Sequence, residues 1–325
     1  PNAVNVVKPK ITPVSVNRDA KSEFLSSTLN LMSRNILSQD VKMIEPKFID
    51  FSKDLEIDEM NSLPILYKRN NENERFQISD VIAIGTNSDK KLKLATDYLQ
   101  YLGTKNLSAS QKAEDFYKLG CNLSVNTTSK ETKITLTGLS NNFEKSINLL
   151  EDILANSIAD EEALISLKTA YQKQKEDAKL NRQIILFSAM SSYAKYGNNS
   201  SFTNTINDKE LELITSADLL NIIHSLTKFK HKVLYYGPDN ISDVKKLMLE
   251  VHNTTELIEI IQKDLNVEKE MDSSKVYVID YDMKQAEVIM FTKGEKLNND
   301  EYSIIKFHNE YFGGGMSSIV FQDMR

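Results

Sequence analysis

Three consecutive glycines, Gly313, Gly314 and Gly315, stand between two helical patterns near the end of this 325-residue chain. The first pattern covers residues 302–312 and the second covers residues 316–325. Glycine tolerates positive φ and lets other backbone approach closely, so three in a row predict a forced bend between two packed helices. No Gly, Asn or Pro stops the second helix. We therefore expect the chain to be a piece of a longer domain.

The composition is that of an ordinary soluble globular protein, with 40% hydrophobic and 26% charged residues. The net charge is −6 and the basic cluster at residues 228–232 is short, so nucleic acid is not an expected partner. No apolar run approaches the ~18 residues that a membrane span needs. The single Cys121 has no base near it in sequence and is interpreted as a small core residue.

Hydrophobic periodicity divides the chain into three parts. Residues 1–43 are predicted to be an extended linker with an amphipathic helix, residues 44–262 a complete α+β domain, and residues 275–325 the start of a second, homologous α+β domain. Two strands followed by two helices occur in both domains, which favours helices layered on an antiparallel or mixed sheet.

The expected elements follow from the same patterns and from turn residues. Expected strands cover 65–67, 76–84, 134–137, 232–236, 276–279 and 286–291, and the first two are expected to form a hairpin. Expected helices cover 88–103, 108–119, 141–156, 160–180, 181–196 and 216–228, with another beginning at Ser242 and one at Asp300.

The glycine segment, FGGGMSSIVFQDMR at residues 312–325, resembles a signature of the pitrilysin/insulinase family of zinc metallopeptidases, the inverted zincins. The helix that closes at Gly103, with residues 107–108 and 116–120 after it, resembles the opening of the family's metal-type domain. Residues 235–238 resemble its late strand. The resemblance covers roughly residues 40–325 and implies a clamshell of two halves, each a pair of homologous domains. It also implies a chamber in which a peptide adds as a strand to a sheet edge.

The family's metal motif is H-x-x-E-H on a helix, with two His ligands on one face and a Glu base between them. Aligning the helix on Gly103 places Leu94, Asp97 and Tyr98 at these three positions. A catalytic zinc site needs three protein ligands, and Asp97 is the single carboxylate among the three. Glu176 is the nearest candidate for the family's later Glu ligand. We therefore expect neither zinc nor a catalytic residue in this segment, and we interpret Leu94 and Tyr98 as packing residues.

The resemblance also implies that Arg325, with Gly313, Gly314 and Gly315 before it, helps to hold substrate. The alternative is that Arg325 is a frayed terminal residue, because the family's partner Tyr falls beyond it. A phosphate-binding role for the glycines is disfavoured because they follow a helix and lack the Lys of a phosphate loop. The four histidines, at positions 224, 231, 252 and 308, are interpreted as surface or satisfied core residues.

These observations favour the non-catalytic C-terminal half of a zinc-dependent peptidase. Such a half would wall the chamber and bind peptide substrate, while the catalytic half would hold the zinc and cleave. Two alternatives remain: a purely structural subunit, or a partner subunit that completes a zinc site in trans. The compartment stays open, with the periplasm or cell envelope expected if the parent protein carries a signal peptide.

Overall fold

The computed structural model describes residues 45, 48–252, 257–261, 263–270 and 272–324. The chain divides into two units, residues 1–50 and residues 51–325, and nearly all described residues belong to the second. The predicted linker and amphipathic helix at residues 1–43 lie outside the described residues. In the described part, no helix is long and apolar enough to cross a bilayer.

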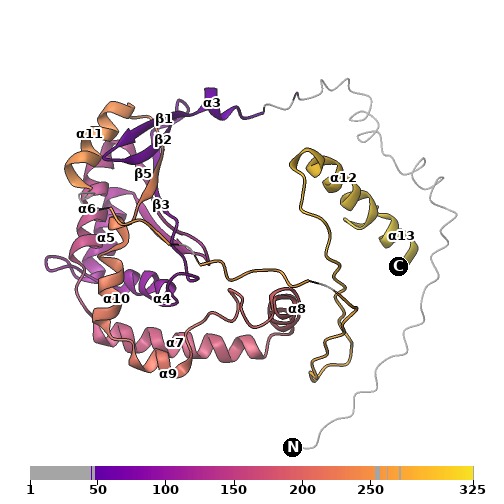
Figure 1. Ribbon diagram of the computed structural model, residues 1–325. Helices are drawn as coiled ribbons and strands as arrows, with labels where there is room; N and C mark the ends of the chain where they lie inside the picture. The colour runs from indigo at the N-terminus through magenta and orange to yellow at the C-terminus, as the bar shows by residue number, and fades with distance from the viewer. Residues whose placement is uncertain (1–44, 46–47, 253–256, 262, 271, 325) are drawn as a thin grey trace, which may run out of the picture. The chain divides into compact units, whose positions relative to one another are not determined.

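The second unit is built on a six-stranded mixed sheet (Figure 1). Its strands are β1 (Glu56–Met60), β2 (Leu63–Arg69), β3 (Arg75–Ile82), β4 (Asn122–Thr127), β5 (Thr132–Leu139) and β6 (His231–Gly237). Their order across the sheet is β1-β2-β6-β3-β5-β4. The β2–β6 pair is parallel and all other neighbours are antiparallel. The predicted α+β class with a layered mixed sheet is confirmed.

The helices come in runs between the strands, as the α+β pattern predicts. The α-helices are α3 (Phe51–Asp54), α4 (Leu92–Tyr98), α5 (Ala109–Leu119), α6 (Phe143–Asn156), α7 (Glu161–Lys179), α8 (Ser191–Tyr196), α9 (Asp208–Leu213), α10 (Ser216–Ile223), α11 (Ile241–Val251), α12 (Tyr302–Phe312) and α13 (Ile319–Met324). A π-helical stretch, η4 (Ile184–Met190), precedes α8, and 3₁₀ turns cover η2 (Leu99–Tyr101), η3 (Ser140–Asn142), η5 (Leu226–Lys228) and η6 (Asn299–Glu301).

The core lies between one face of the sheet and the helices that cover it. On α6, the buried residues Phe143, Ile147 and Leu150 recur at helical spacing and face the sheet. The Phe143 ring packs edge-on against Phe76 of β3 and Tyr235 of β6, with ring centroids 4.8 Å and 5.5 Å apart. Aromatic pairs of this geometry add about 0.5–1.5 kcal/mol beyond the apolar area that they bury, so α6 is firmly attached to the centre of the sheet.

Helix α5 shows how local sequence sets an element's bounds. The Ser108 side chain accepts from the backbone N–H of Gln111, whose side chain accepts from the Ser108 N–H, which completes a capping box. Gly120 ends the helix in the left-handed region at φ 62°, where other residues are strained. The prediction of a helix over 108–119 is confirmed.

The predicted hairpin of residues 65–67 and 76–84 is wrong. Strands β2 and β3 both form, but β6 lies between them, parallel to β2 and antiparallel to β3. Turn residues between two strands predict a hairpin only when no other strand competes for the same edges. Here β6, about 150 residues later in the chain, pairs with both.

The predicted strands at 276–279 and 286–291 are also wrong, since both segments are irregular in the structure. Their β-branched residues gave the strand signal, yet the side chains of Val276, Val278 and Val288 are between 79% and 88% exposed. Two short strands without a third strand or an apolar layer are marginally stable at best. Polar contacts hold this part of the chain against α7 to α8 instead, such as the 2.6 Å bond from the Tyr281 hydroxyl to the Leu180 carbonyl.

The three glycines separate α12 from α13, as the sequence predicts. Gly315 has φ 107°, a left-handed conformation that favours glycine. A Cβ on Gly314 would lie 2.8 Å from the Cα of Glu310, so a side chain there would collide with α12. Apolar side chains of α12, including Ile304 and Phe307, are exposed, and among the described residues this helix lacks the expected close packing.

Candidate functional site

Helix α4 carries Leu94, Asp97 and Tyr98, the three positions that the sequence analysis aligned with the metal motif. It lies against β4, α7 and α10, and its apolar residues point to two sides. Leu94 and Tyr98 are 1% and 0% exposed. A helix that is apolar on two sides is buried on two sides, so these two side chains contribute to the core.

The Tyr98 hydroxyl is fully engaged with the backbone at the start of α7. It donates to the Asp160 carbonyl at 2.8 Å and accepts from the Asp160 N–H at 2.9 Å. Asp160 is also the N-cap of α7, accepting from Ala163 N–H. Burial raises the pKa of Tyr98 above its ordinary value, so the phenol stays protonated. Tyr98 therefore holds the start of α7 in place, and a protonated phenol is not among the usual ligands of zinc.

The carboxylates that remain as candidate ligands are paired with lysines. Asp97 forms an ion pair with Lys93 one helical turn earlier. Glu176 is about two-thirds exposed on α7 and pairs with Lys179 at 2.6 Å. Because a zinc site needs several convergent ligands, the residues at these positions do not fit the family's zinc ion.

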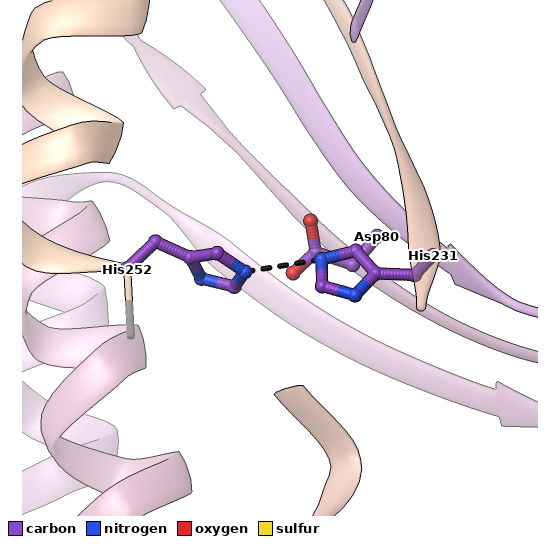
Figure 2. A group of neighbouring side chains, drawn as sticks. All are labelled: Asp80, His231 and His252. Atoms are coloured by element: carbon purple, nitrogen blue, oxygen red, sulfur yellow. Dashed lines mark hydrogen bonds between the residues drawn. The ribbon is translucent and has the colours of Figure 1, made fainter. Parts of the chain in front are cut away.

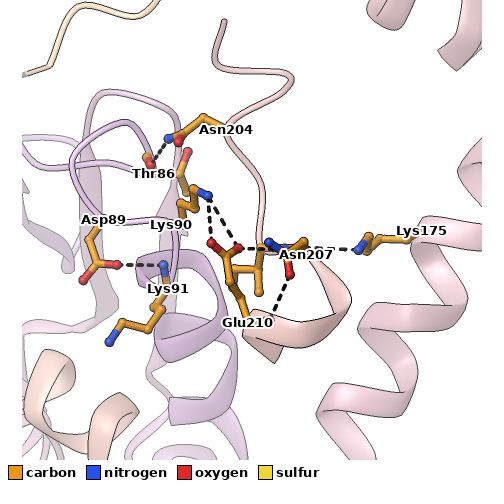
Figure 3. Close-up of polar contacts among 9 residues, drawn as sticks. Thr86, Asp89, Lys90, Lys91, Lys175, Asn204, Asn207 and Glu210 are labelled. Atoms are coloured by element: carbon orange, nitrogen blue, oxygen red, sulfur yellow. Dashed lines mark hydrogen bonds and ion pairs between the residues drawn. The ribbon is translucent and has the colours of Figure 1, made fainter. Parts of the chain in front are cut away.

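A set of polar contacts fixes the loop that leads into α4 (Figure 3). Asn204 donates to the Thr86 carbonyl at 2.7 Å, and Lys90 pairs with Glu210 at 3.2 Å. The Asn207 backbone N–H and then Lys90 hold the pKa of Glu210 below its ordinary value, which keeps it charged. Because this ion pair is exposed to solvent, it contributes little to the stability of the fold. Together, the Asn204–Thr86 and Lys90–Glu210 contacts hold the loop before α4 next to the start of α9.

Strand β4 lies at an edge of the sheet beside α4. Its final residue, Thr127, contacts the Thr96 hydroxyl of α4 at 3.0 Å. Leu123 and Val125 are half-buried on the core face, and Ser124 on the other face is exposed. No described strand pairs with the outer edge of β4. An open edge is a row of unpaired backbone donors and acceptors, a template on which another strand can add.

The glycine segment contributes local contacts. The Ser318 hydroxyl donates to the Gly315 carbonyl at 2.8 Å and accepts from the Phe321 N–H at 3.3 Å, which caps the start of α13. Arg325 lies outside the described residues, so its substrate-binding role stays a prediction.

Two of the four histidines lie in a buried cluster that the sequence analysis missed. His231 and His252 face each other beside Asp80, and Glu151 hydrogen-bonds His252. Burial disfavours the charged form of His252, but the Glu151 hydrogen bond and the charges of Asp80 and Glu151 outweigh it and raise its pKa. The available signal was Asp80, a carboxylate at a core-facing position of the alternating strand β3.

Comparisons with known proteins agree with the fold described above. Residues 96–209 match the sequence model of the insulinase family, peptidase family M16. No curated protein sequence matches the chain at a significant level.

Three solved structures share the fold. The M16 inactive domain from Pseudomonas fluorescens has 16% identity and a TM-score of 0.53, with 61% of this chain and 50% of that chain covered. The periplasmic protease PqqL from Escherichia coli has 14% identity and a TM-score of 0.54, covering 79% and 31%. The ferredoxin protease FusC, solved as a mutant in complex with Arabidopsis ferredoxin, has 12% identity and a TM-score of 0.54, also covering 79% and 31%. This chain therefore spans half or less of each structure.

Proposed function

Because residues 96–209 match the sequence model of the insulinase family, we propose that this chain is a non-catalytic half of a zinc-dependent peptidase. It binds an extended segment of a peptide or protein substrate along the outer edge of β4 and walls the chamber. A separate catalytic half, carrying the zinc ligands, hydrolyses the bound chain. The complex of FusC with ferredoxin favours proteins among the substrates.

The observation that carries this proposal is the open edge of β4 beside α4. Strand β4, with sequence NLSVNT, contains no charged residue. Strand β1, at the other edge, has sequence EIDEM with three acidic residues. Charges on an edge strand oppose pairing with another chain. The β4 edge is therefore suited to strand addition, whereas the acidic side chains of β1 oppose it at the other edge.

The absence of catalysis from this half rests on α4. Leu94 and Tyr98 are core residues and Asp97 is ion-paired with Lys93, so α4 provides no zinc-activated water. Hydrolysis then requires ligands from another domain or subunit.

Two alternatives predict different behaviour. A purely structural subunit would bind no peptide at β4. A partner that completes a zinc site in trans would stimulate a catalytic subunit and lose this effect when Arg325 is replaced. The periplasmic location of PqqL favours an envelope location here as well.

Peptide binding to the isolated chain tests the proposal. Fluorescence anisotropy would follow a labelled ten-residue peptide of alternating Val and Thr. The double variant Ser124→Lys/Asn126→Lys places two cations on β4 and should weaken binding about tenfold, or 1.4 kcal/mol. Both side chains are exposed, so the fold should tolerate the change.

The matched control is Ile57→Lys on β1, where the side chain is 66% exposed and no effect on binding is expected. A peptide N-methylated at alternate residues should bind poorly, because it cannot complete the ladder of hydrogen bonds. Equal loss of affinity in the β1 and β4 variants would contradict the proposal. So would chelator-sensitive cleavage of the peptide by this chain alone.

A further inference from the structure

Asp80, His231 and His252 form a buried cluster between the sheet and the helices (Figure 2). They are 4%, 2% and 3% exposed. Asp80 lies on β3, His231 is the first residue of β6 and His252 directly follows α11. One ligand atom from each lies within 4.8 Å of the others. Three segments far apart in sequence thus bring two imidazoles and a carboxylate to one point.

Hydrogen bonds fix which ring nitrogens of the two histidines carry protons. The Nδ1 of His231 lies 2.6 Å from the Phe229 carbonyl, and the Nδ1 of His252 lies 2.7 Å from the Glu151 carboxylate. Both partners are acceptors, so each Nδ1 carries the proton and each neutral ring has its lone pair on Nε2. The two Nε2 atoms lie only 3.0 Å apart. Two lone pairs at this distance repel unless an electropositive atom lies between them.

The Asp80 carboxylate points to the same requirement. Its Oδ1 is buried and has no hydrogen-bond partner among the described residues. A buried carboxylate oxygen without a partner is costly. Figure 2 shows this carboxylate beside the line that joins the two Nε2 atoms. With Glu151 behind His252, the two carboxylates bring a charge of −2 to a site with two neutral imidazoles, which one divalent cation would balance.

We propose that His231 Nε2, His252 Nε2 and the Asp80 carboxylate bind one zinc ion in a buried site, with a water molecule as the fourth ligand. Zinc lies about 2.0–2.1 Å from imidazole nitrogen and about 2.0–2.2 Å from carboxylate oxygen. Two nitrogens 3.0 Å apart can both reach one ion at these lengths, and a carboxylate oxygen of Asp80 lies within 4.8 Å of a nitrogen of each ring. Two imidazoles and one carboxylate suit zinc better than calcium or magnesium.

The surroundings of the ligands match those of metal sites in proteins. Histidine ligands almost always donate their other N–H to a carboxylate or a backbone carbonyl, which fixes ring orientation. Here Glu151 does this for His252 and the Phe229 carbonyl does it for His231.

A shared proton between the two rings is the competing explanation. One added proton would satisfy both Nε2 atoms through an N–H···N bond, but it would leave the Asp80 Oδ1 unpartnered. A cation binds all three groups at once. The buried position favours a structural role that joins β3 and β6 to the end of α11, and this site is separate from α4.

Metal analysis of the purified chain tests the proposal. We expect about one zinc per chain after purification without chelators, measured by mass spectrometry of the metal. Competition with a chromophoric chelator gives the affinity of the metal-free chain. Asp80→Asn should weaken zinc binding at least 100-fold, and Glu151→Gln should weaken it about 10–100-fold, because it disturbs the orientation of His252.

Two variants on α4, Asp97→Asn and Tyr98→Phe, are the controls and should keep the wild-type zinc affinity. These two controls distinguish the proposed zinc site from the α4 positions aligned with the metal motif. If the zinc proposal fails, the proposed peptide binding at β4 is not affected. If Asp80→Asn does not fold, cobalt substitution of the wild-type chain replaces it and should give the visible absorption of four-coordinate nitrogen and oxygen ligation. A wild-type chain that binds neither zinc nor cobalt, or a folded Asp80→Asn chain that binds zinc as tightly as wild type, would overturn the inference.

Discussion

The two edges of the same sheet differ in chemistry. The β1 edge carries Glu56, Asp58 and Glu59, and Asp58 is also paired with Lys245 of α11. The exposed side chains of β4 are those of Asn122, Ser124 and Asn126, which carry no charge, and the strand's end is attached to α4 through Thr127. Exposed sheet edges tend to pair with other chains, and proteins commonly guard them with charge. Because β4 has no charged side chain, its outer edge is the better suited of the two to pair with an added strand.

The largest expected effect concerns how β4 is held in the sheet. Leu136 of β5 is fully buried and lies opposite Leu123 of β4 in the strand register. Leu136→Ala should lower the free energy of unfolding by about 2–5 kcal/mol, through lost burial and a residual cavity. Urea unfolding would measure it.

Leu123→Ala is the matched test of the edge itself. Leu123 is only half-buried, so its truncation should cost clearly less, about 1 kcal/mol. Equal losses for the two variants would mean that the β4 edge is covered, and the contrast between the two edges would fail.

The next effect compares one tyrosine near each edge. Tyr98, beside β4, donates to and accepts from the backbone of Asp160, whereas the Tyr67 hydroxyl on β2 donates to the Asp239 carbonyl at 2.8 Å. Tyr98→Phe leaves the Asp160 N–H without its partner, while the Asp160 carbonyl still accepts from the Leu164 N–H at 3.0 Å. The variant should cost about 1–3 kcal/mol. Tyr67→Phe should cost about 1 kcal/mol. Thermal unfolding of both variants measures the difference, and a larger loss for Tyr67→Phe would contradict this ranking.

The smallest effect is a pH dependence on the β4 side. Lys112 of α5 is 7% exposed and donates to the Leu99 and Gln100 carbonyls at 2.9 and 3.2 Å. Burial lowers the pKa of Lys112 to about 8. Between pH 8 and 10.5 the unfolded chain holds a proton that the folded chain has lost, so this residue makes stability rise with pH.

The comparison variant for this effect is Lys112→Met, which cannot titrate. From pH 8 to pH 9, the stability of the wild type should rise relative to that of the variant by about 1 kcal/mol. Urea unfolding at both pH values gives this difference. A constant difference would show that Lys112 keeps an ordinary pKa.

Elements defined by local residues were predictable from the sequence. Helix α5 has its capping box at Ser108 and its stop at Gly120, and the alternation of Ile134 and Leu136 with threonines gave β5. These signals act within a few residues and need no knowledge of the rest of the fold.

Features made by distant segments were not predictable in this way. The place of β6 between β2 and β3 depends on a pairing across about 150 residues. The cluster of Asp80, His231 and His252 joins three segments whose proximity follows from that pairing. Strand patterns at 276–279 and 286–291 were misread because alternation alone does not supply the partner strands that a sheet requires.

Hydrogen–deuterium exchange with and without the Val/Thr peptide tests the central claim most directly. Amides on an open strand edge exchange readily, and a strand that adds there protects them. The account predicts slower exchange in residues 122–127 at saturating peptide, with no change in residues 56–60. Protection at 56–60 instead, or no protection at 122–127 while the peptide is bound, would contradict it.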